Sequence, residues 1–249
     1  MKKIILIGGS GVLGKHFAQK LSKNNLVHVA DVGLKKEQIA DNRYNHFLDV
    51  LNEKKVDEFF KKIKKKYGAF DILINNAAFT TEMSLNFSKL NKKEHFSTKI
   101  WEKTINTNLT GPFLCCKYFL KYHHNKRIDQ RVINIGTIYG MYSPHHYIYT
   151  NQNFFSSISY TAGKAGLIGM TKWLATKFAK EKTNFNMISP AGVFNNQNKK
   201  FLKDYTRLIP KKKMATEEQI FSAIEFLISN NADYVIGQNI LVDGGFSAW

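Results

Sequence analysis

A continuous aliphatic run near the N-terminus, Ile4–Ile7, leads directly into the glycine-rich stretch GGSGVLG. A short apolar run of this kind is typical of a parallel strand that is buried on both faces of its sheet. After the glycines, apolar residues recur at helical spacing as far as Leu21. A strand, a glycine-rich turn and a helix in this order predict the first unit of a doubly wound α/β sheet.

Strand and helix patterns then alternate to the end of the chain. Further strands are predicted at 26–31, 43–50, 70–78, 131–137, 185–192 and 238–245, and further helices at 56–68, 100–123, 160–179 and 216–229. We therefore predict a single Rossmann-type domain over residues 1–249. Its parallel sheet should have about seven strands, with helices on both faces.

The glycine-rich turn is a candidate phosphate-binding site. Gly8, Gly11 and Gly14 would allow, in that order, a tight turn, a close approach of the backbone to a pyrophosphate, and close packing of helix on strand. The N-terminus of the helix adds free N–H groups and the positive end of a dipole. A plain strand–helix turn is the alternative, but the position at the start of a parallel sheet favours a dinucleotide site. The cofactor contacts expected between the glycines are Ser10, Val12 and Leu13.

Asp31 ends the second predicted strand and bears on the choice of cofactor. A carboxylate there can accept hydrogen bonds from both ribose hydroxyls of NAD, and it would repel the 2′-phosphate of NADP. Lys15, Lys35 and Lys36 lie near enough in the sequence to soften that repulsion. We expect NAD, and NADP less.

The net charge of +18 raises the question of nucleic-acid binding. Only four of the 37 basic residues are arginines, however, and proteins that read phosphates and base edges favour the bidentate arginine fork. We expect no nucleic-acid partner. A positive field that attracts a small anionic substrate is the alternative use of this charge.

The sequence also argues against a membrane protein and against a metal site. No apolar run approaches the ~20 residues of a membrane helix, and the run at Ile4–Ile7 is shorter than the roughly 7–15 residues of a signal peptide. The adjacent Cys115 and Cys116 cannot form an ordinary disulfide and have no metal-ligand spacing. We expect a cytoplasmic protein with reduced, buried thiols, no membrane association and no metal.

A tyrosine and a lysine four residues apart, Tyr160 and Lys164, are candidates for proton transfer. They share a helix face, and the ammonium can stabilise a phenolate, so the tyrosine can act as general acid or base. The spacing alone proves little, since about one or two such pairs are expected by chance in this composition. Indeed Tyr122 and Lys126 form a second one, at a polar helix end.

A series of motifs in order along nearly the whole chain resembles the classical short-chain dehydrogenase/reductase family. After the glycine turn come LDV, NNAA, INTNLTGPF, INIGT, YTAGK, SPAGV and GQNILVDGG. The segments GTIYGMYSPHHYIY and FNNQ also look like members from flagellin-modification and nonulosonate sugar clusters.

The resemblance implies an NAD(P)-dependent oxidoreductase and a role for each matching residue. Asn108 would hold a water in a proton relay to Lys164, Tyr160 would be the acid/base, and Lys164 would also hold the nicotinamide ribose. The implied cofactor contacts are Asp49 and Val50 at the adenine, Asn76, Ala77 and Ala78 at its ribose, and Pro190 and Val193 at the nicotinamide. It also implies a homodimer or homotetramer built on the two long helices.

The chain departs from the family pattern at the hydroxyl that polarises the substrate carbonyl. Thr137 stands where the family has serine, and it lies farther from Tyr160 than usual. The rival hydroxyls are Ser143, Ser156, Ser157 and Ser159. We favour Thr137, because it sits at the carboxyl end of a strand, where such sheets bind ligands.

Three extra segments point to the substrate: a polar segment at 80–103, an insertion at about 140–159 and a lid at about 194–214. The candidate substrate residues are Tyr142, His145, His146 and Asn195, with Tyr149, Asn151 and Gln152 beside them. These hydroxyls, imidazoles and amides suit a polyhydroxylated sugar, and the lid lysines suit its phosphate. Surface filler is the alternative. The competing functions are a 3-oxoacyl or small-ketone reductase and a non-catalytic cofactor-binding regulator.

Overall fold

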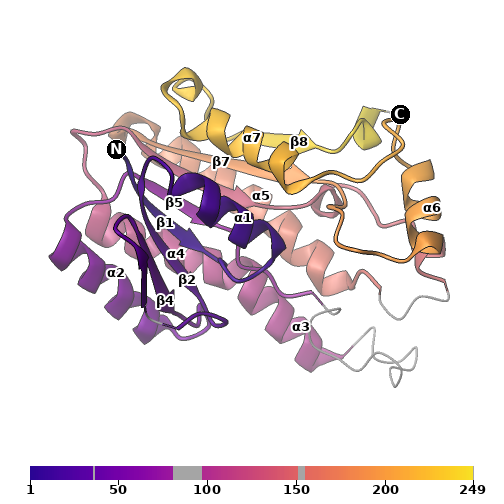
Figure 1. The fold of residues 1–249 in the computed structure, drawn as a ribbon, viewed down its shortest axis with the longest axis horizontal. Helices are drawn as coiled ribbons and strands as arrows, with labels where there is room; N and C mark the ends of the chain where they lie inside the picture. The colour runs from indigo at the N-terminus through magenta and orange to yellow at the C-terminus, as the bar shows by residue number, and fades with distance from the viewer. Residues whose placement is uncertain (36, 81–96, 151–154, 249) are drawn as a thin grey trace.

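The computed structural model describes residues 1–35, 37–80, 97–150 and 155–248 (Figure 1). The strands are β1 Lys3–Ile7, β2 Leu26–Asp31, β3 Glu37–Ala40, β4 Arg43–Phe47, β5 Ile72–Asn75, β6 Gln130–Ile135, β7 Thr183–Pro190 and β8 Asn239–Val242. The α-helices are α1 Val12–Leu21, α2 Glu53–Tyr67, α3 Thr98–Ile105, α4 Gly111–His123, α5 Ile158–Phe178, α6 Lys199–Arg207 and α7 Glu217–Ile228.

The strands form one sheet in the order β3-β4-β2-β1-β5-β6-β7-β8. All neighbours from β4 to β8 are parallel, which confirms the predicted doubly wound fold. The order reverses between β1 and β5, and ligands bind beyond the carboxyl ends of the strands at such a point. One strand was not predicted: β3, which pairs antiparallel with β4 at the edge of the sheet.

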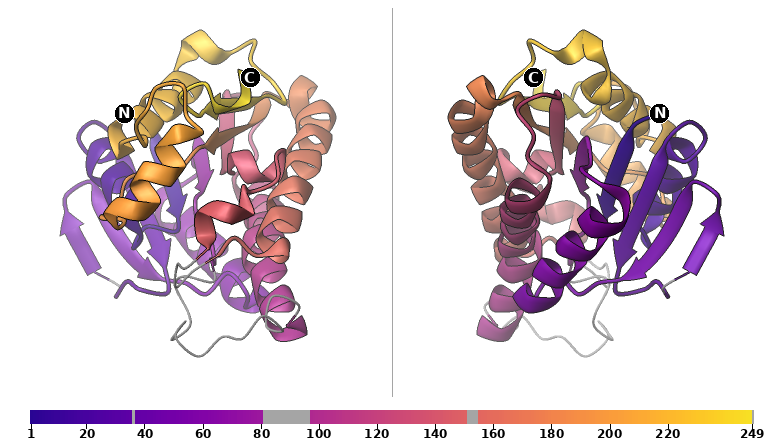
Figure 2. Two further views of the ribbon diagram at one scale, coloured as in Figure 1. Left: turned by 90° about the vertical axis from the view of Figure 1, so that its right-hand side faces the viewer. Right: turned by 90° about the vertical axis from the view of Figure 1, so that its left-hand side faces the viewer.

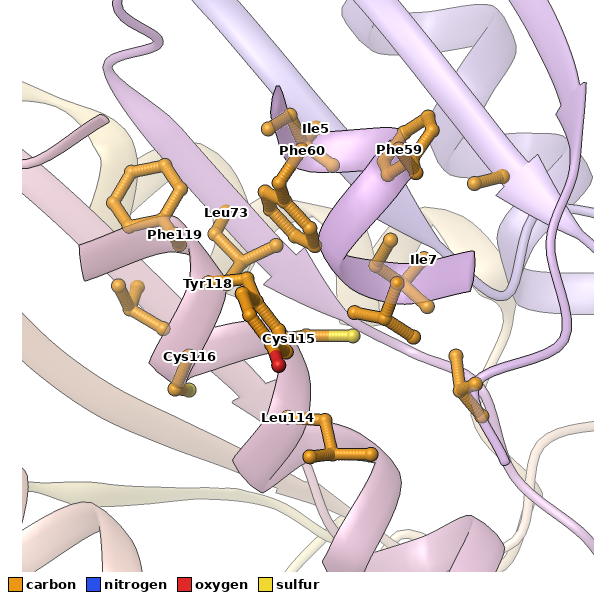
Figure 3. Packing of buried hydrophobic residues seen from close by; sticks show 14 of the residues in the cluster. Ile5, Ile7, Phe59, Phe60, Leu73, Leu114, Cys115, Cys116, Tyr118 and Phe119 are labelled. Carbon is orange, nitrogen blue, oxygen red and sulfur yellow. The ribbon is translucent and has the colours of Figure 1, made fainter. Parts of the chain in front are cut away.

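Both faces of the sheet are covered, as the apolar run at Ile4–Ile7 predicts. Ile5 and Ile7 pack toward α2, α4 and α5, whereas Ile4 and Leu6 pack toward α1 and α7. Successive strand residues point to opposite faces, so a strand between two helix layers is apolar throughout. Figure 3 shows part of the cluster on the α2 and α4 side of the sheet, with Phe59 and Phe60 on α2 and Cys115 and Phe119 on α4.

The long helix predicted at 100–123 is divided. A π-helical turn, η4 Asn106–Thr110, separates α3 from α4. Pro112 has no N–H to give to the carbonyl of Asn108 four residues earlier, and its ring would crowd that carbonyl in an α-helix. The wider turn accommodates the proline, and such turns are frequent at functional sites.

The insertion and the lid meet at one end of the sheet. A short 3-10 turn, η5 Ile138–Gly140, leads into the insertion, a second one, η6 His146–Tyr149, lies within it, and the lid holds α6. Figure 2 shows α6 and these turns on the same side of the molecule. The two segments share a small apolar cluster in which Phe201 and Tyr205 of α6 pack with Tyr139 and Ile148. In the described part of the chain, none of the helices combines the length and the apolar character needed to cross a membrane.

Candidate active site

One large cavity of about 1160 Å³ lies along the carboxyl ends of the strands. It extends from the glycine-rich turn, past Asp31, to Tyr160 and the lid. The predicted site residues that line it are Gly8, Ser10, Gly11, Val12, Leu13, Asp31, Asp49, Val50, Asn76, Ala77, Ala78, Thr137, Tyr160, Lys164, Pro190, Val193 and Asn195. Residues predicted from widely separated motifs are thus brought to a single surface.

The glycine-rich turn has the space that a pyrophosphate needs. A side chain at Gly8, where φ is +89°, would collide with the backbone of Asn76 and Ala77, and one at Gly14 would collide with Gly8. At Gly11 a side chain would meet nothing within 4 Å, because this glycine borders the cavity. Gly11 caps α1 without a side-chain hydrogen bond, so the N–H groups of the first turn stay available for an anion. The turn therefore fits a dinucleotide.

Asp31 is held in place by the turn that it faces. One carboxylate oxygen accepts from the N–H of Ser10 at 3.1 Å, and the other accepts from the N–H of Gly33 at 2.8 Å. Lys15 and Lys35 are exposed and do not line the cavity, and Lys36 lies outside the described residues. In the described lining, the charged side chains near the glycine turn are thus the carboxylates of Asp31 and Asp49.

Lys164 is buried beneath the cavity floor and only 2% exposed. Its Nζ donates to the carbonyl oxygen of Ile135 at 2.7 Å, and desolvation by burial lowers its pKa to about 8. Tyr160 lies one helical turn earlier on α5, and its N–H is capped by the Ser157 hydroxyl at 3.2 Å. Both side chains border the cavity. An ammonium close to a phenol favours the phenolate, so this placement suits proton exchange at Tyr160.

The structure narrows the choice of carbonyl-polarising hydroxyl. Thr137, directly after β6, lines the cavity and accepts a long hydrogen bond of 3.4 Å from the N–H of Tyr139. Ser156 also lines the cavity, and its buried oxygen has no partner among the described residues. Ser157 lines the cavity too, but its hydroxyl already accepts from the N–H of Tyr160 and bonds Ser159 at 3.1 Å, and Ser143 does not line the cavity. Thr137 and Ser156 are the two candidates that remain.

Asn108 lies behind the cavity wall rather than in it. It is fully buried on the π-helical turn, and its side-chain amide makes two hydrogen bonds of 2.9 Å with the backbone N–H and carbonyl of Phe79. The side chain thus fastens this turn to the segment after β5. The predicted role of Asn108 in a water relay to Lys164 stays a prediction. Its backbone carbonyl would bind the water, because Pro112 has no N–H to donate to that carbonyl.

Three of the predicted substrate residues are not brought to the cavity. Tyr142 and His145 pack edge-on against Phe246 near the C-terminus, and His146 is exposed. Asn195 does line the cavity. Asn151 and Gln152 lie outside the described residues. The lid lysines also face away, because α6 turns Phe201 and Tyr205 inward and leaves Lys199, Lys200 and Lys203 on its other faces.

Two tyrosines in the cavity wall, Tyr139 and Tyr205, were missed in the sequence. Tyr139 follows Thr137 by two residues after a strand end, and Tyr205 follows Phe201 by four on an amphipathic helix. Each spacing indicates a side chain on the cavity side of its segment. The Tyr205 hydroxyl accepts from the N–H of Gly192 at 2.5 Å. Tyr139 and Tyr149 have their hydroxyls 3.3 Å apart. Among the described residues, no cluster of His, Cys, Asp and Glu that could hold a metal ion is found.

Comparison with known proteins identifies the class that this fold and cavity define. Residues 12–247 match the family model described as Enoyl-(Acyl carrier protein) reductase. The chain belongs to the short-chain dehydrogenase/reductase family, and it is an NAD(P)-dependent oxidoreductase.

Particular relatives differ in what their names say. The chain is 32% identical to 3-oxoacyl-[acyl-carrier-protein] reductase FabG of Buchnera aphidicola subsp. Schizaphis graminum, over 98% of this chain and 96% of the relative. It is 26% identical to post-translational flagellin modification protein A of Campylobacter coli, over 98% of each chain.

Solved structures agree on the fold but hold different cofactors. A short-chain dehydrogenase from Leptospira borgpetersenii with bound NAD+ has a TM-score of 0.84 and 29% identity, covering 99% of this chain and 92% of that one. ElxO with NADP bound has a TM-score of 0.82 and 28% identity, covering both chains fully. The neighbours therefore support a nicotinamide dinucleotide and leave the choice between NAD and NADP to the residues of this chain.

Proposed function

We propose that this protein interconverts an alcohol and a ketone on a small polyhydroxylated substrate of the sugar class, with NAD(H) as the cofactor. The main support is the lining of the substrate end of the cavity, beyond Tyr160 and Lys164. Its polar wall comprises Tyr139, Tyr149, Ser156, Asn195 and Asn196. Hydroxyls and amides both donate and accept hydrogen bonds, so this wall matches a ligand with many hydroxyls.

The chain's own residues would divide the reaction among them. A nicotinamide bound beside Pro190 and Val193 would supply or accept the hydride. Tyr160 would give its proton to the carbonyl oxygen or take it from the alcohol, assisted by the charge of Lys164. Thr137 or Ser156 would donate a hydrogen bond to that oxygen and stabilise the charge that develops on it.

The preference for NAD follows from Asp31. A carboxylate at the predicted ribose site would repel a 2′-phosphate. The proposal also includes a cytoplasmic location and a homodimer or homotetramer. Exposed apolar side chains on the outer faces of α4 and α5, namely Phe113, Ile158 and Trp173, support self-association, since such residues gather at interfaces between proteins.

A 3-oxoacyl reductase is the second candidate. The identity to the FabG relatives favours it, and so do Phe155, Phe201 and Met214, which give one side of the substrate end an apolar surface for an acyl chain. A non-catalytic cofactor-binding regulator is disfavoured because Tyr160 and Lys164 both border the cavity.

A substrate panel separates the two candidates. Purified protein would be assayed at 340 nm with NAD or NADH against sugars, sugar phosphates and nucleotide sugars in one set, and against acetoacetyl thioesters in another. We expect turnover in the first set. Turnover of the thioesters alone would overturn the sugar proposal in favour of acyl reduction. A wild-type protein that binds NADH but turns over neither set would favour the regulator.

A further inference from the structure

The segment Pro190–Val193 is anchored by a residue of the lid helix. Gly192 donates its N–H to the hydroxyl of Tyr205 on α6 at 2.5 Å, and its carbonyl accepts from Ala215 at 3.0 Å. The preceding Ala191 donates to the carbonyl of Val242 at 3.1 Å. Of these three bonds, the one to Tyr205 is made by a side chain of the lid helix; Gln197, which precedes that helix in the lid, donates to the carbonyl of Val193 at 3.0 Å.

The sequence is adapted to this contact at Gly192. A side chain there would place its Cβ 2.7 Å from the Tyr205 ring and 2.6 Å from the Met214 methyl group. Glycine therefore lets the phenol ring lie directly against the backbone, at hydrogen-bond distance from its N–H. Tyr205 is 3% exposed, so this is a built contact in the cavity wall rather than a surface one.

The hydroxyl of Tyr205 is part of a larger group of phenols. Because its oxygen accepts from Gly192, its own proton is available to the neighbouring Tyr139, with which it interacts. Tyr139 in turn lies 3.3 Å, oxygen to oxygen, from Tyr149 of the insertion. Burial raises the pKa of both Tyr139 and Tyr205, so both phenols keep their protons.

We propose that Tyr205 is a positioning residue, which holds the backbone at Gly192 so that the lid and the nicotinamide-binding segment adopt one joint arrangement. The proposal rests on the proposed function in placing the nicotinamide ring beside Pro190 and Val193. It follows that the seating of the lid helix over the substrate and the orientation of the nicotinamide are coupled through the hydrogen bond between Tyr205 and Gly192, beside the bond that Gln197 makes with Val193. The adenine half of the cofactor, at the other end of the cavity, does not depend on it.

Tyr205→Phe tests this, because it keeps the ring and removes the hydroxyl. Fluorescence titration would measure the affinity for NADH and, by competition, for ADP-ribose, which lacks the nicotinamide. We expect the variant to bind NADH about tenfold more weakly, as for the loss of one hydrogen bond, and to bind ADP-ribose within about twofold of wild type. Amide hydrogen exchange at Gly192 should become at least about tenfold faster in the unliganded variant.

Tyr118→Phe is the matched control. The Tyr118 hydroxyl donates to Glu53 at 2.9 Å, and neither residue lines the cavity. This variant should change neither affinity. Equal NADH affinity in wild type and Tyr205→Phe would overturn the proposal, and so would an equal loss for ADP-ribose, which would indicate general damage. A wild type that binds NADH but turns over no carbonyl would overturn the proposed function alone, and the binding ratio would still decide the role of Tyr205.

Discussion

The proposed preference for NAD should be reversed in large part by one substitution, Asp31→Asn. The carboxylate is fixed by the N–H groups of Ser10 and Gly33, so it cannot turn away from an approaching 2′-phosphate. Asparagine keeps the size and one of these bonds but loses the charge. Among the described residues, the cavity lining beside Asp31 has no cation that would favour NADP.

The magnitude has two parts. Two unit charges about 5 Å apart interact by about 3 kcal/mol at an effective dielectric constant of about 20, and screening at this partly buried site leaves roughly 1–2 kcal/mol. NADH loses a charge-assisted hydrogen bond of about 1.5–2 kcal/mol to its ribose. The ratio of kcat/KM for NADH over NADPH should therefore fall about 10²- to 10³-fold.

Initial rates with both cofactors at fixed substrate would measure this ratio. Asp49→Asn is the control, because Asp49 is expected at the adenine, which both cofactors share, so it should change both rates alike. A wild type that prefers NADPH, or an Asp31→Asn variant with an unchanged ratio, would refute the reasoning.

Three further outcomes are expected. Either Thr137→Val or Ser156→Ala should lower kcat about 10²- to 10³-fold while the other has little effect; equal small effects would remove both from the carbonyl-polarising role. Burial lowers the pKa of His28 to about 3 and of His123 to about 4. The contribution of these two neutral imidazoles to the free energy of unfolding is therefore present above their ordinary pKa of 6.5, and it is lost as the pH falls from there toward the lowered values. Urea unfolding should show a loss of up to about 4 kcal/mol between pH 7 and 5, and a His28→Phe variant with the same pH slope would contradict this. Trp173→Glu, at an exposed position on α5, should lower the oligomeric mass measured by light scattering, and an unchanged mass would exclude that face as the interface.

The central part of the fold could be predicted because local and global signals agree there. The run Ile4–Ile7 reports burial on two faces, and the glycines after it report a turn at the sheet's switch point. The edge strand β3, with the sequence EQIA, was not predicted, because a short polar strand has no apolar pattern and forms only by pairing with β4. The π-helical turn escaped although Pro112 marked it.

Site residues at the ends of strands could be predicted. Residues whose place in the site depends on the direction of a side chain in an irregular segment could not. Asp31 is the last residue of β2 and Thr137 follows β6 by two residues, so their placement on the cavity follows from the sheet. In the insertion there is no regular period, and the sequence could not show that Tyr142 and His145 face Phe246 while Tyr139 and Tyr149 face the cavity. In the lid the helical period was present, and it placed the lysines outside and Tyr205 inside.

The most direct test of the account is the turnover of Tyr160→Phe beside its affinity for NADH. We expect the variant to bind NADH within about threefold of wild type, because the ring and Lys164 remain. Turnover of the substrate found in the panel should fall by at least about 10²–10⁴, the contribution of a positioned acid/base. A Tyr160→Phe enzyme with near-normal turnover would contradict the central claim that this phenol transfers the proton.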